Sequence, residues 1–275
     1  MSLSIASLNS GSNGNCYYIS NEHEAVFIDA GLSCRETEIR MSRLGLSMQK
    51  VKAIIVSHEH SDHINGITTL SRKYRIPVYI TGTTLQHSRV HLSPDLIRPF
   101  IKHQVIQVGG LSITSFPKFH DASDPHSFIV SGNGVTIGVF TDIGHCCDQV
   151  HHYFKQCHAI FLEANYDEEM LTNGRYPHNL KARIRGNNGH LSNAQALALF
   201  QTHRPSFMSH VILSHLSKDN NCPDLVQNLF SQWAANTHIS IASRYKETPV
   251  YQIHNEKKVV SKKTKATQAQ LQLFQ

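Results

Sequence analysis

The sequence has no long run of apolar residues, and this absence argues against a chain built on membrane-spanning helices. None of its stretches approaches the roughly 18 uninterrupted apolar residues that such a helix needs. The first residues also lack a basic segment followed by a long apolar core, so no signal peptide is expected. With neither feature, the chain is expected to be a cytoplasmic protein that does not bind a membrane.

Cysteine is also scarce. The 275 residues contain six cysteines, which have neither the spacing of a disulfide framework nor a paired Cys-x-x-Cys motif. In a cytoplasmic chain they are expected to be reduced thiols. Seven residues along and around one expected helix superficially resemble a further zinc site, but they lack paired ligands: His145, Cys146, Cys147, His151, His152, Cys157 and His158.

Acidic residues are outnumbered, with 20 Asp and Glu against 26 Lys and Arg and a formal net charge of +6. This balance favours an anionic partner such as nucleic acid. Part of the excess lies in residues 256–275, which are polar and basic and are expected to form a flexible tail. No linker or short repeat interrupts residues 1–255, so one domain is expected there. The alternative is two similar β-rich halves that meet near 140–160.

Histidine, in contrast, is abundant, and one stretch concentrates it. Residues 57–63 read Ser-His-Glu-His-Ser-Asp-His and directly follow an apolar run that is expected to be a strand. Because side chains alternate along a strand, His58 and His60 should point to the same side. Asp62 and His63 then fall on the following turn and can face a second position. The pattern predicts two adjacent metal ions; the alternative is a histidine-rich surface loop in a chain with 20 histidines.

Residues of the metal-ligand type also follow four other expected strands. They are Asp29, His120, Asp142 and His215. Strands that all finish in such residues can bring them to one edge of a sheet sandwich. Zinc favours histidine and carboxylate ligands and keeps an open position in catalytic sites. A carboxylate can bridge two ions about 3.5–4 Å apart, and such pairs activate water for displacement at phosphorus.

Helices are expected between the strands, in segments with capping residues and apolar faces. The expected ranges are 34–44, 62–74, 146–156, 193–203 and 223–234. Residues 82–100 are expected to contain a short helix and a loop. Residues 165–185 are expected to be irregular and basic.

Four motifs together resemble a known family: Ser-Gly-Ser-Asn-Gly-Asn at 10–15, the histidine cluster at 58–63, Gly-His-Leu-Ser-Asn at 189–193 and His-Leu-Ser at 215–217. The chain resembles the metallo-β-lactamase superfamily, and within it the YycJ/VicX/WalJ-like bacterial hydrolases, which are regarded as candidate nucleases related to ribonucleases Z and J. The resemblance extends to about residue 255. It implies an α/β (α+β) fold, a four-layer αββα sandwich of two mixed β-sheets with helices on both outer faces.

The resemblance also implies a role for each metal-ligand residue. It implies two sets of three ligands, one for each divalent ion: His58, His60 and His120, and Asp62, His63 and His215. Asp142 would bridge the ions, and Asp29 would orient a ligand from behind. Zinc is the expected metal and manganese the alternative. A hydroxide between the ions would be the nucleophile, and Asp62 would also steer that water as a base.

Two further residues match those of ribonuclease Z-like enzymes. Glu163 and His190 resemble the pair that protonates the leaving oxygen. The chemistry needs such an acid, because a departing alkoxide is a poor leaving group. Simpler roles are a surface charge at a strand end for Glu163 and a core or capping residue for His190. For the third histidine of the first ion, His120 is preferred to His126 because it directly ends a strand.

Substrate contacts are expected in two places, a Ser/Asn/Gly turn over residues 9–15 and a basic stretch over 175–185. Backbone amides in such a turn can hold phosphate oxygens, and arginines add charge-assisted contacts. The simpler readings are a tight hairpin and a solvated loop. The candidate residues are Ser10, Ser12, Asn13, Asn15, Arg183 and Arg185.

The leading hypothesis is a dinuclear-metal phosphodiesterase, an exonuclease that acts on DNA or RNA. No Gly/Pro-rich arm of the ribonuclease Z type is visible, and the 72 residues between Asp142 and His215 are too few for the extra domain of ribonuclease J. The alternative is a hydrolase of a small thioester, lactone or cyclic phosphate. A third hypothesis is a regulatory binding protein in two-component signalling. The sequence leaves the oligomeric state open.

Overall fold

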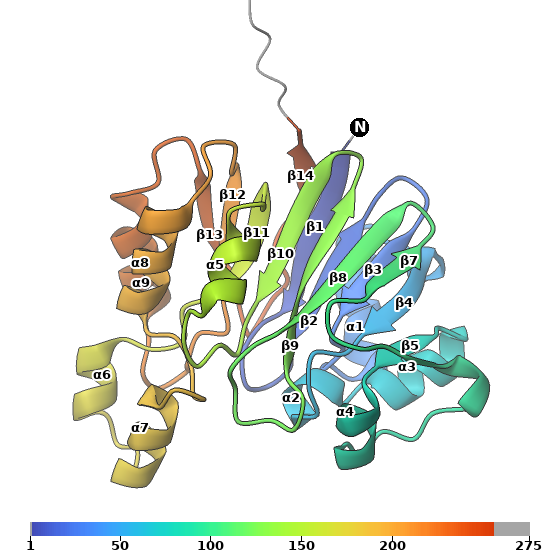
Figure 1. Cartoon of the computed structure of the whole chain (residues 1–275), viewed down its shortest axis with the longest axis horizontal. Coiled ribbons are helices and arrows are strands. Elements are labelled where there is room, and N and C mark those ends of the chain that lie inside the picture. Colours follow the sequence, from blue (N-terminus) through green and yellow to red (C-terminus); the bar gives the residue numbers. More distant parts are fainter. Residues whose placement is uncertain (1, 256–275) are drawn as a thin grey trace, which may run out of the picture.

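Two seven-stranded β-sheets pack face to face, and helices cover both outer faces (Figure 1). The computed structural model describes residues 2–255, so the flexible tail predicted for residues 256–275 lies outside them. The arrangement confirms the predicted four-layer αββα sandwich of two mixed sheets. Among the described residues, no helix combines the length and the apolar character that crossing a membrane requires.

The first sheet combines the N-terminal strands with the last strand of the described chain. Its order is β14-β1-β2-β3-β4-β5-β6. The strands from β3 to β6 pair in parallel and the others pair antiparallel. The strands are β1 (Ser2–Asn9), β2 (Cys16–Ser20), β3 (Ala25–Ile28), β4 (Val51–Ile55), β5 (Val78–Ile80), β6 (Ile97–Pro99) and β14 (Tyr251–His254).

The second sheet repeats this plan with the order β13-β12-β11-β10-β9-β8-β7. Here β10 to β13 pair in parallel, whereas β7 to β10 form antiparallel hairpins. The strands are β7 (Val105–Val108), β8 (Leu111–Pro117), β9 (His126–Gly132), β10 (Val135–Phe140), β11 (Ala159–Glu163), β12 (His210–Ser214) and β13 (His238–Ile241). The chain changes sheet between β6 and β7, not near 140–160.

Helices shield the outer face of each sheet. Met41, Ile67 and Leu70 of α1 and α3 pack on the first sheet, and α5, α8 and α9 cover the second. The helices are α1 (Cys34–Arg43), α2 (Ser61–Ile64), α3 (Ile67–Tyr74), α4 (Gly82–His87), α5 (Asp148–Phe154), α6 (Glu168–Asn173), α7 (His178–Arg185), α8 (Asn193–His203) and α9 (Pro223–Ser231), with short 3₁₀ turns at Met48–Lys50 and Pro94–Leu96.

Alternating strand residues fill the space between the sheets. In β2, Tyr17 and Ile19 point into this core, whereas Cys16 and Tyr18 pack beneath the helices. The ring of Tyr17 meets that of Phe161 in β11, with ring centroids 4.8 Å apart. Burying one such side chain stabilises the fold by roughly 1.5–3 kcal/mol. Contacts of this kind fix the two sheets against each other, and the site described below draws residues from both.

Two local predictions are wrong. The single helix predicted over 62–74 is divided into α2 and α3, because the Gly66 N–H donates to the Ala30 carbonyl oxygen at 2.8 Å instead of to Asp62 four residues earlier. The segment 165–185, predicted to be irregular, contains α6 and α7; Asp167 caps α6 by accepting hydrogen bonds from two backbone N–H groups. In addition, β6 falls in the range 82–100, where no strand was predicted.

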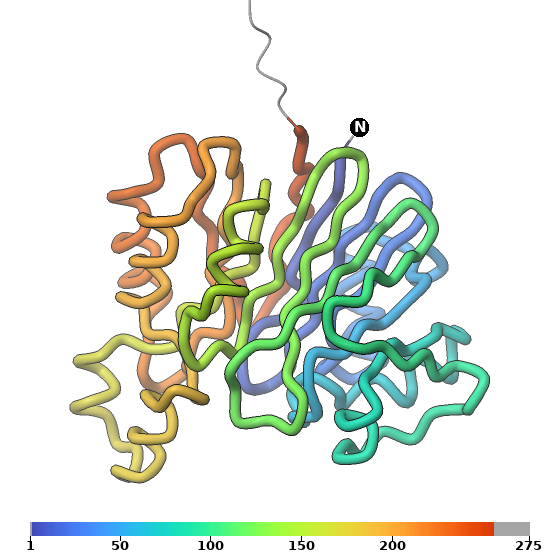
Figure 2. The backbone as a smooth tube through the Cα atoms, viewed as in Figure 1, coloured from blue at the N-terminus to red at the C-terminus, as the bar shows by residue number. Residues whose placement is uncertain are grey.

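One end of the sandwich collects the loops that follow the parallel strands. The strands β10, β11 and β12 run parallel, so their carboxyl ends share one edge. Figure 1 shows α2, α6 and α7 at this end, opposite the start of β1 and the tip of β14. The loop between β8 and β9 reaches the same end (Figure 2). This end therefore receives the predicted ligands from both sheets.

Candidate metal centre

Three of the predicted site residues have left-handed backbone conformations directly after strands. The φ angles are 59° at Asp29, 56° at Asp142 and 57° at His215. Residues other than glycine seldom adopt such angles, which cost energy and cluster at functional sites. At each position the chain leaves the strand sharply, and the side chain stays at the sheet edge, where all three are buried.

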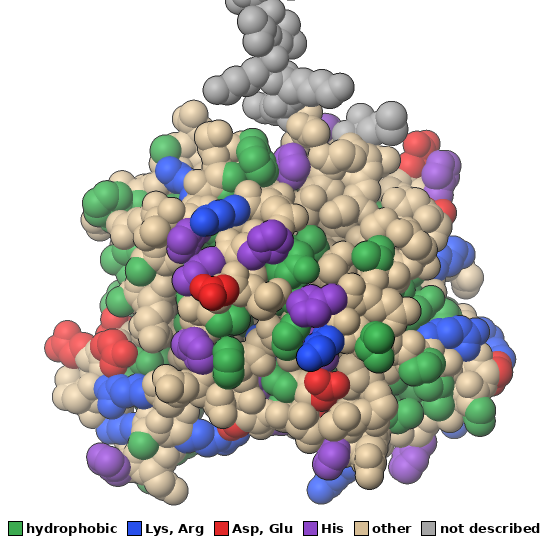
Figure 3. Space-filling view, in the orientation of Figure 1, with side chains coloured by type: hydrophobic (Ala, Val, Ile, Leu, Met, Phe, Trp, Pro, Cys, Tyr) green, Lys and Arg blue, Asp and Glu red, His purple; other side chains and the backbone are tan. Residues whose placement is uncertain are grey.

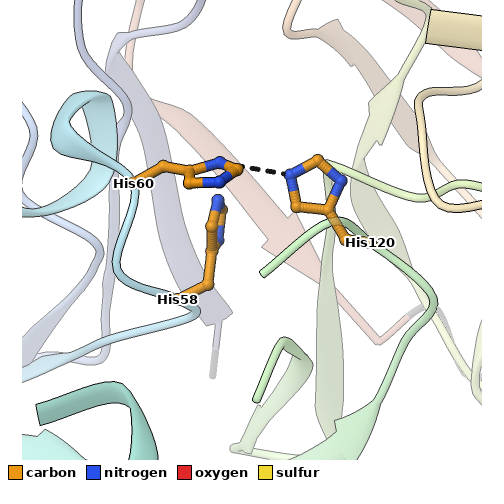
Figure 4. A group of neighbouring side chains, drawn as sticks. All are labelled: His58, His60 and His120. Carbon is orange, nitrogen blue, oxygen red and sulfur yellow. Dashed lines mark hydrogen bonds between the residues drawn. The ribbon is translucent and has the colours of Figure 1, made fainter. Parts of the chain in front are cut away.

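Three histidines form the first cluster (Figure 4). His58 and His60 come from the segment after β4 of the first sheet, and His120 comes from the loop after β8 of the second. One ring nitrogen from each lies within 4.8 Å of the others, and His60 Nδ1 is 3.4 Å from His120 Nε2. Rings that converge from both sheets in this way can offer three nitrogen ligands to one ion.

A second cluster adjoins the first. One ligand atom each from Asp62, His63 and His215 lies within 4.8 Å of the others, and Asp142 forms a further group with His58 and His63. His215 Nε2 is 3.4 Å from one carboxylate oxygen of Asp142, and His63 Nε2 is 3.4 Å from the other. The structure thus gathers all seven predicted ligands, with Asp142 between the two sets.

Hydrogen bonds to the Nδ1 atoms orient three of the ligand rings. His63 Nδ1 bonds the Asp29 carboxylate at 2.7 Å, and this carboxylate also accepts the Ser57 hydroxyl at 2.7 Å. Ser57 Oγ lies 2.8 Å from His58 Nδ1, and the Gly189 carbonyl oxygen lies 3.0 Å from His120 Nδ1. Such partners fix the ring and leave Nε2 to face an ion.

The electrostatics of the cluster fit cations. Burial lowers the pKa of His58 well below its usual value, which keeps the ring neutral as a metal ligand must be. For His215, burial opposes charge, but the adjacent Asp142 carboxylate prevails and raises the pKa to about 10. His58 Nε2 and Asp142 Oδ2 are buried without a hydrogen-bond partner among residues 2–255. A divalent ion would bind both atoms and so compensate for the hydrogen bonds that they lack.

Glu163 and His190 form a pair at the edge of the second cluster. His190 Nδ1 lies 2.7 Å from Glu163 Oε1, and Glu163 is fully buried. Burial works to raise the pKa of Glu163, but the neighbouring His190 outweighs it and the pKa falls to about 2. Glu163 also accepts the backbone N–H of Ile143 at 2.7 Å. A carboxylate held in this way fixes the orientation of the His190 ring, which lines the cavity beside the clusters.

The position of Asp62 depends on close backbone approach. A Cβ on Gly31 would lie 1.7 Å from the Asp62 carbonyl oxygen, so only glycine fits there. That carbonyl accepts the Asn15 backbone N–H at 2.7 Å, and Asn15 Nδ2 lies 3.1 Å from both the Asp62 carboxylate and His63 Nε2. The turn at 9–15 therefore helps to hold two ligands.

The predicted substrate contacts fall into two sets. Ser10 and Asn15 are buried, and Ser10 Oγ accepts the backbone N–H of His215 at 2.7 Å. Ser12 and Arg183 line a cavity of about 370 Å³ beside the clusters, and Asn13 is exposed in the same turn. Arg185 instead bonds Glu168 of α6 at 3.0 Å. Contact with a substrate remains a prediction for all of these residues.

His126 and the histidines and cysteines of residues 145–158 belong to none of the ligand groups within residues 2–255. His126 is buried in β9, where its Nδ1 lies 3.0 Å from the Asp124 carbonyl oxygen and its ring contacts Phe100. Within residues 2–255, no group of three ligand atoms from residues 145–158 converges within 4.8 Å.

Two residues that support the ligands were not predicted from the sequence. Asn165 Nδ2 donates to the His215 carbonyl oxygen at 2.7 Å and lies 3.2 Å from its Nδ1. Ser57 links Asp29 to His58. Asn165 stands two residues after Glu163, and Ser57 directly precedes the histidine motif. Their closeness to Glu163 and to the histidine motif was the available signal in the sequence, since neither Ser nor Asn is a usual zinc ligand.

Comparisons with known proteins agree with this geometry. Residues 24–216 match the family described as "Beta-lactamase superfamily domain". The chain is 35% identical over 235 residues to "Exodeoxyribonuclease YycJ" of Bacillus anthracis, which covers 84% of this chain and 89% of that protein. It is 29% identical over 244 residues to "Exodeoxyribonuclease WalJ" of Streptococcus pneumoniae, with 87% and 91% covered.

Solved structures show the same fold. The metallo-β-lactamase fold protein YhfI from Bacillus subtilis matches with a TM-score of 0.70 at 14% identity, over 92% of this chain and 100% of that one. Zn²⁺-bound PqqB from Methylobacterium extorquens matches with a TM-score of 0.68 at 13% identity, over the same shares. At these identities the likeness concerns the fold.

Proposed function

The chain belongs to the metallo-β-lactamase superfamily, and on that premise we propose that it is a metal-dependent exonuclease that acts on DNA or RNA. The observation that carries the proposal is the Glu163–His190 pair, which lies beside the intact ligand clusters and provides an acid for an alkoxide leaving group. Most of the chain is similar to proteins named exodeoxyribonucleases, and this similarity favours DNA as the substrate.

Two ligand sets would hold the ions, with Asp142 shared: His58, His60 and His120, and Asp62, His63 and His215. When bound, two divalent ions, zinc or alternatively manganese, would supply a water of lowered pKa and neutralise charge on the phosphate. The remaining tasks fall to residues of the chain. Asp62 lines the cavity and would accept a proton from the attacking water. His190 would give a proton to the departing oxygen, while Glu163 holds its ring.

The cavity has the size of a site for one nucleotide-sized group. Its volume of about 370 Å³ is near the lower end of the roughly 300–1,000 Å³ of small-ligand sites. Tyr176, Leu180 and Arg183 of the α7 region line it opposite the histidines. The guanidinium of Arg183 pairs with Asp121 and can add a phosphate contact. A cavity with room for about one nucleotide favours removal of terminal nucleotides.

A nuclease panel tests the proposal. Protein loaded with Zn²⁺ or Mn²⁺ is incubated with end-labelled single- and double-stranded DNA and RNA, and with a thioester, a lactone and a cyclic phosphate. We expect stepwise shortening of at least one nucleic acid, and no shortening by His60→Ala. If the wild-type protein cleaves no nucleic acid but turns over one of the small esters, the alternative function is correct.

The acid role of His190 makes a sharper prediction. His190→Ala should lower kcat on the nucleic acid by about 10²–10⁴-fold, the usual range for general acid catalysis, with the bound metal unchanged. On a nitrophenyl phosphodiester, whose leaving group needs no proton, the loss should stay below about tenfold. Equal losses on both substrates would show that His190 supports the site in another way.

A further inference from the structure

An exposed aromatic residue directly precedes a histidine of the first ligand cluster in the chain. Phe119 precedes His120 in the chain, and 48% of its surface is open to solvent. Its ring rests on the imidazole of His145, with centroids 4.2 Å apart and planes inclined by 31°. In this Phe119–His145 pair, the imidazole supports the phenyl ring, about half of whose surface stays open to solvent among residues 2–255.

The segments that carry the site hold the pair in place. The Phe119 carbonyl oxygen accepts the backbone N–H of Gly144 at 2.7 Å, and His145 Nδ1 lies 3.0 Å from the Asn187 carbonyl oxygen. A Cβ on Gly144 would lie 2.0 Å from that same oxygen, so the two backbones touch. The pair is therefore tied to the segments of Asp142 and of the Gly-His-Leu-Ser-Asn motif.

A single exposed hydrophobic side chain is ordinary on a protein surface. The face drawn in Figure 3 indeed mixes scattered hydrophobic and histidine side chains instead of carrying one large apolar patch. The feature that sets this pair apart is its attachment to the site, because Phe119 directly precedes His120 and His145 stands three residues after Asp142. A group stacked on Phe119 would therefore lie on the surface next to the segments that carry these two ligands.

We propose that the Phe119–His145 pair is a stacking platform for the nucleobase of a nucleotide at or next to the scissile phosphate. The proposal rests on the nuclease function proposed above and adds the way in which the substrate is held. Aromatic stacking tolerates every base because each has a π-face. The platform would therefore accept strands of any sequence, provided that the stacked base is unpaired.

A second pair in the chain supplies a matched control. Phe207 is 47% exposed and also rests on a histidine, His158, with centroids 4.7 Å apart and planes inclined by 41°. His158 precedes β11 and Phe207 precedes β12, so this pair lies at the end of the sandwich opposite the clusters. Phe207→Ala removes the same chemical group far from the site.

The test combines protein variants with substrate variants. Wild type, Phe119→Ala, Phe119→Tyr and Phe207→Ala, all loaded with Mn²⁺, are assayed on an oligonucleotide and on versions with an abasic nucleotide at either end. Phe119→Ala should lower kcat/KM on the normal oligonucleotide about 5- to 100-fold, the range for one base–aromatic stack. Phe119→Tyr and Phe207→Ala should match wild type. On one abasic substrate, wild type should itself be slower and Phe119→Ala should cost less than about twofold.

Each other outcome has a definite meaning. A loss that is equal on normal and abasic substrates, or absent on both, overturns the platform. If wild type cleaves no nucleic acid, fluorescence anisotropy with the same oligonucleotides decides. Binding that weakens in Phe119→Ala only when the base is present keeps the platform and rejects the nuclease. Binding that does not depend on the base rejects the platform as well.

Discussion

Strand β12 has a histidine at each end, and the two behave in opposite ways. His210 begins the strand and His215 follows it, roughly 16 Å away at the rise of a β-strand. Burial and the neighbouring His238 lower the pKa of His210 to about 4. Burial acts in the same direction on His215, yet the adjacent Asp142 raises its pKa to about 10. The backbone is shared, so the surroundings make the difference.

The surroundings differ mainly in carboxylates. Around His210, the rings of His238 and Tyr251 lie with centroids 5.2–5.5 Å apart. Around His215, Asp62, Asp142 and Glu163 all approach within 3.5 Å. Among the described residues, the His210 end forms no group of three converging ligand atoms. Two neighbouring histidines and a tyrosine therefore do not gather the ligand atoms of a metal centre, whereas histidines among buried carboxylates provide an environment that favours cations.

The largest effect should come from removing the Asp142 carboxylate, which is present beside His215 and, among the residues that the structure describes, has no counterpart beside His210. Asp142→Asn keeps the side-chain size but loses the charge shared by both ligand sets. We expect metal affinity to fall by more than about 100-fold, the upper end for a residue that merely orients a ligand. Elemental analysis after dialysis and a Zn²⁺ titration measure it. His210→Asn, at the other end of β12, should bind metal like wild type. Full metal binding by Asp142→Asn would contradict the comparison.

Local motifs were enough to indicate which residues of the segment 58–63 converge at the site end. The spacing of His58, His60, Asp62 and His63 is short, and the strand before it sets which way the side chains point. The Ser192 cap is equally local, because its partner Gln195 stands three residues on in a capping box. The fold class followed from the resemblance and from strands that end in ligands. Such signals need no knowledge of tertiary contacts.

Features that depend on distant contacts escaped prediction. The helices α6 and α7 are six and eight residues long, too short to form in isolation. They are held by a small apolar cluster of Tyr166, Leu171 and Ile184, to which exposed ion pairs such as Arg185–Glu168 add little. Similarly, the helix predicted over 62–74 is divided at Gly66 because its N–H bonds the carbonyl oxygen of the distant Ala30, a contact that no local pattern indicates.

The smallest expected effect sharpens the comparison at the His210 end. The folded pKa of about 4 lies below the unfolded value of roughly 6.5, so between these pH values the unfolded chain binds a proton that the folded chain lacks. Stability that is present above pH 6.5 is therefore lost as the pH falls toward 4. The full shift corresponds to roughly 3 kcal/mol, but His210 is only half-buried, and about 1 kcal/mol remains after solvent screening.

Urea unfolding of wild type and His210→Asn at pH 7.5 and 4.5 isolates this contribution, because any loss of metal at low pH affects both proteins. The difference in unfolding free energy should move by about 1 kcal/mol in favour of the variant at the lower pH. His238 and Tyr251, the titratable groups that face the ring, are the same in both proteins. A difference that does not change with pH would mean that His210 is not held neutral. The two ends of β12 would then differ only in metal binding.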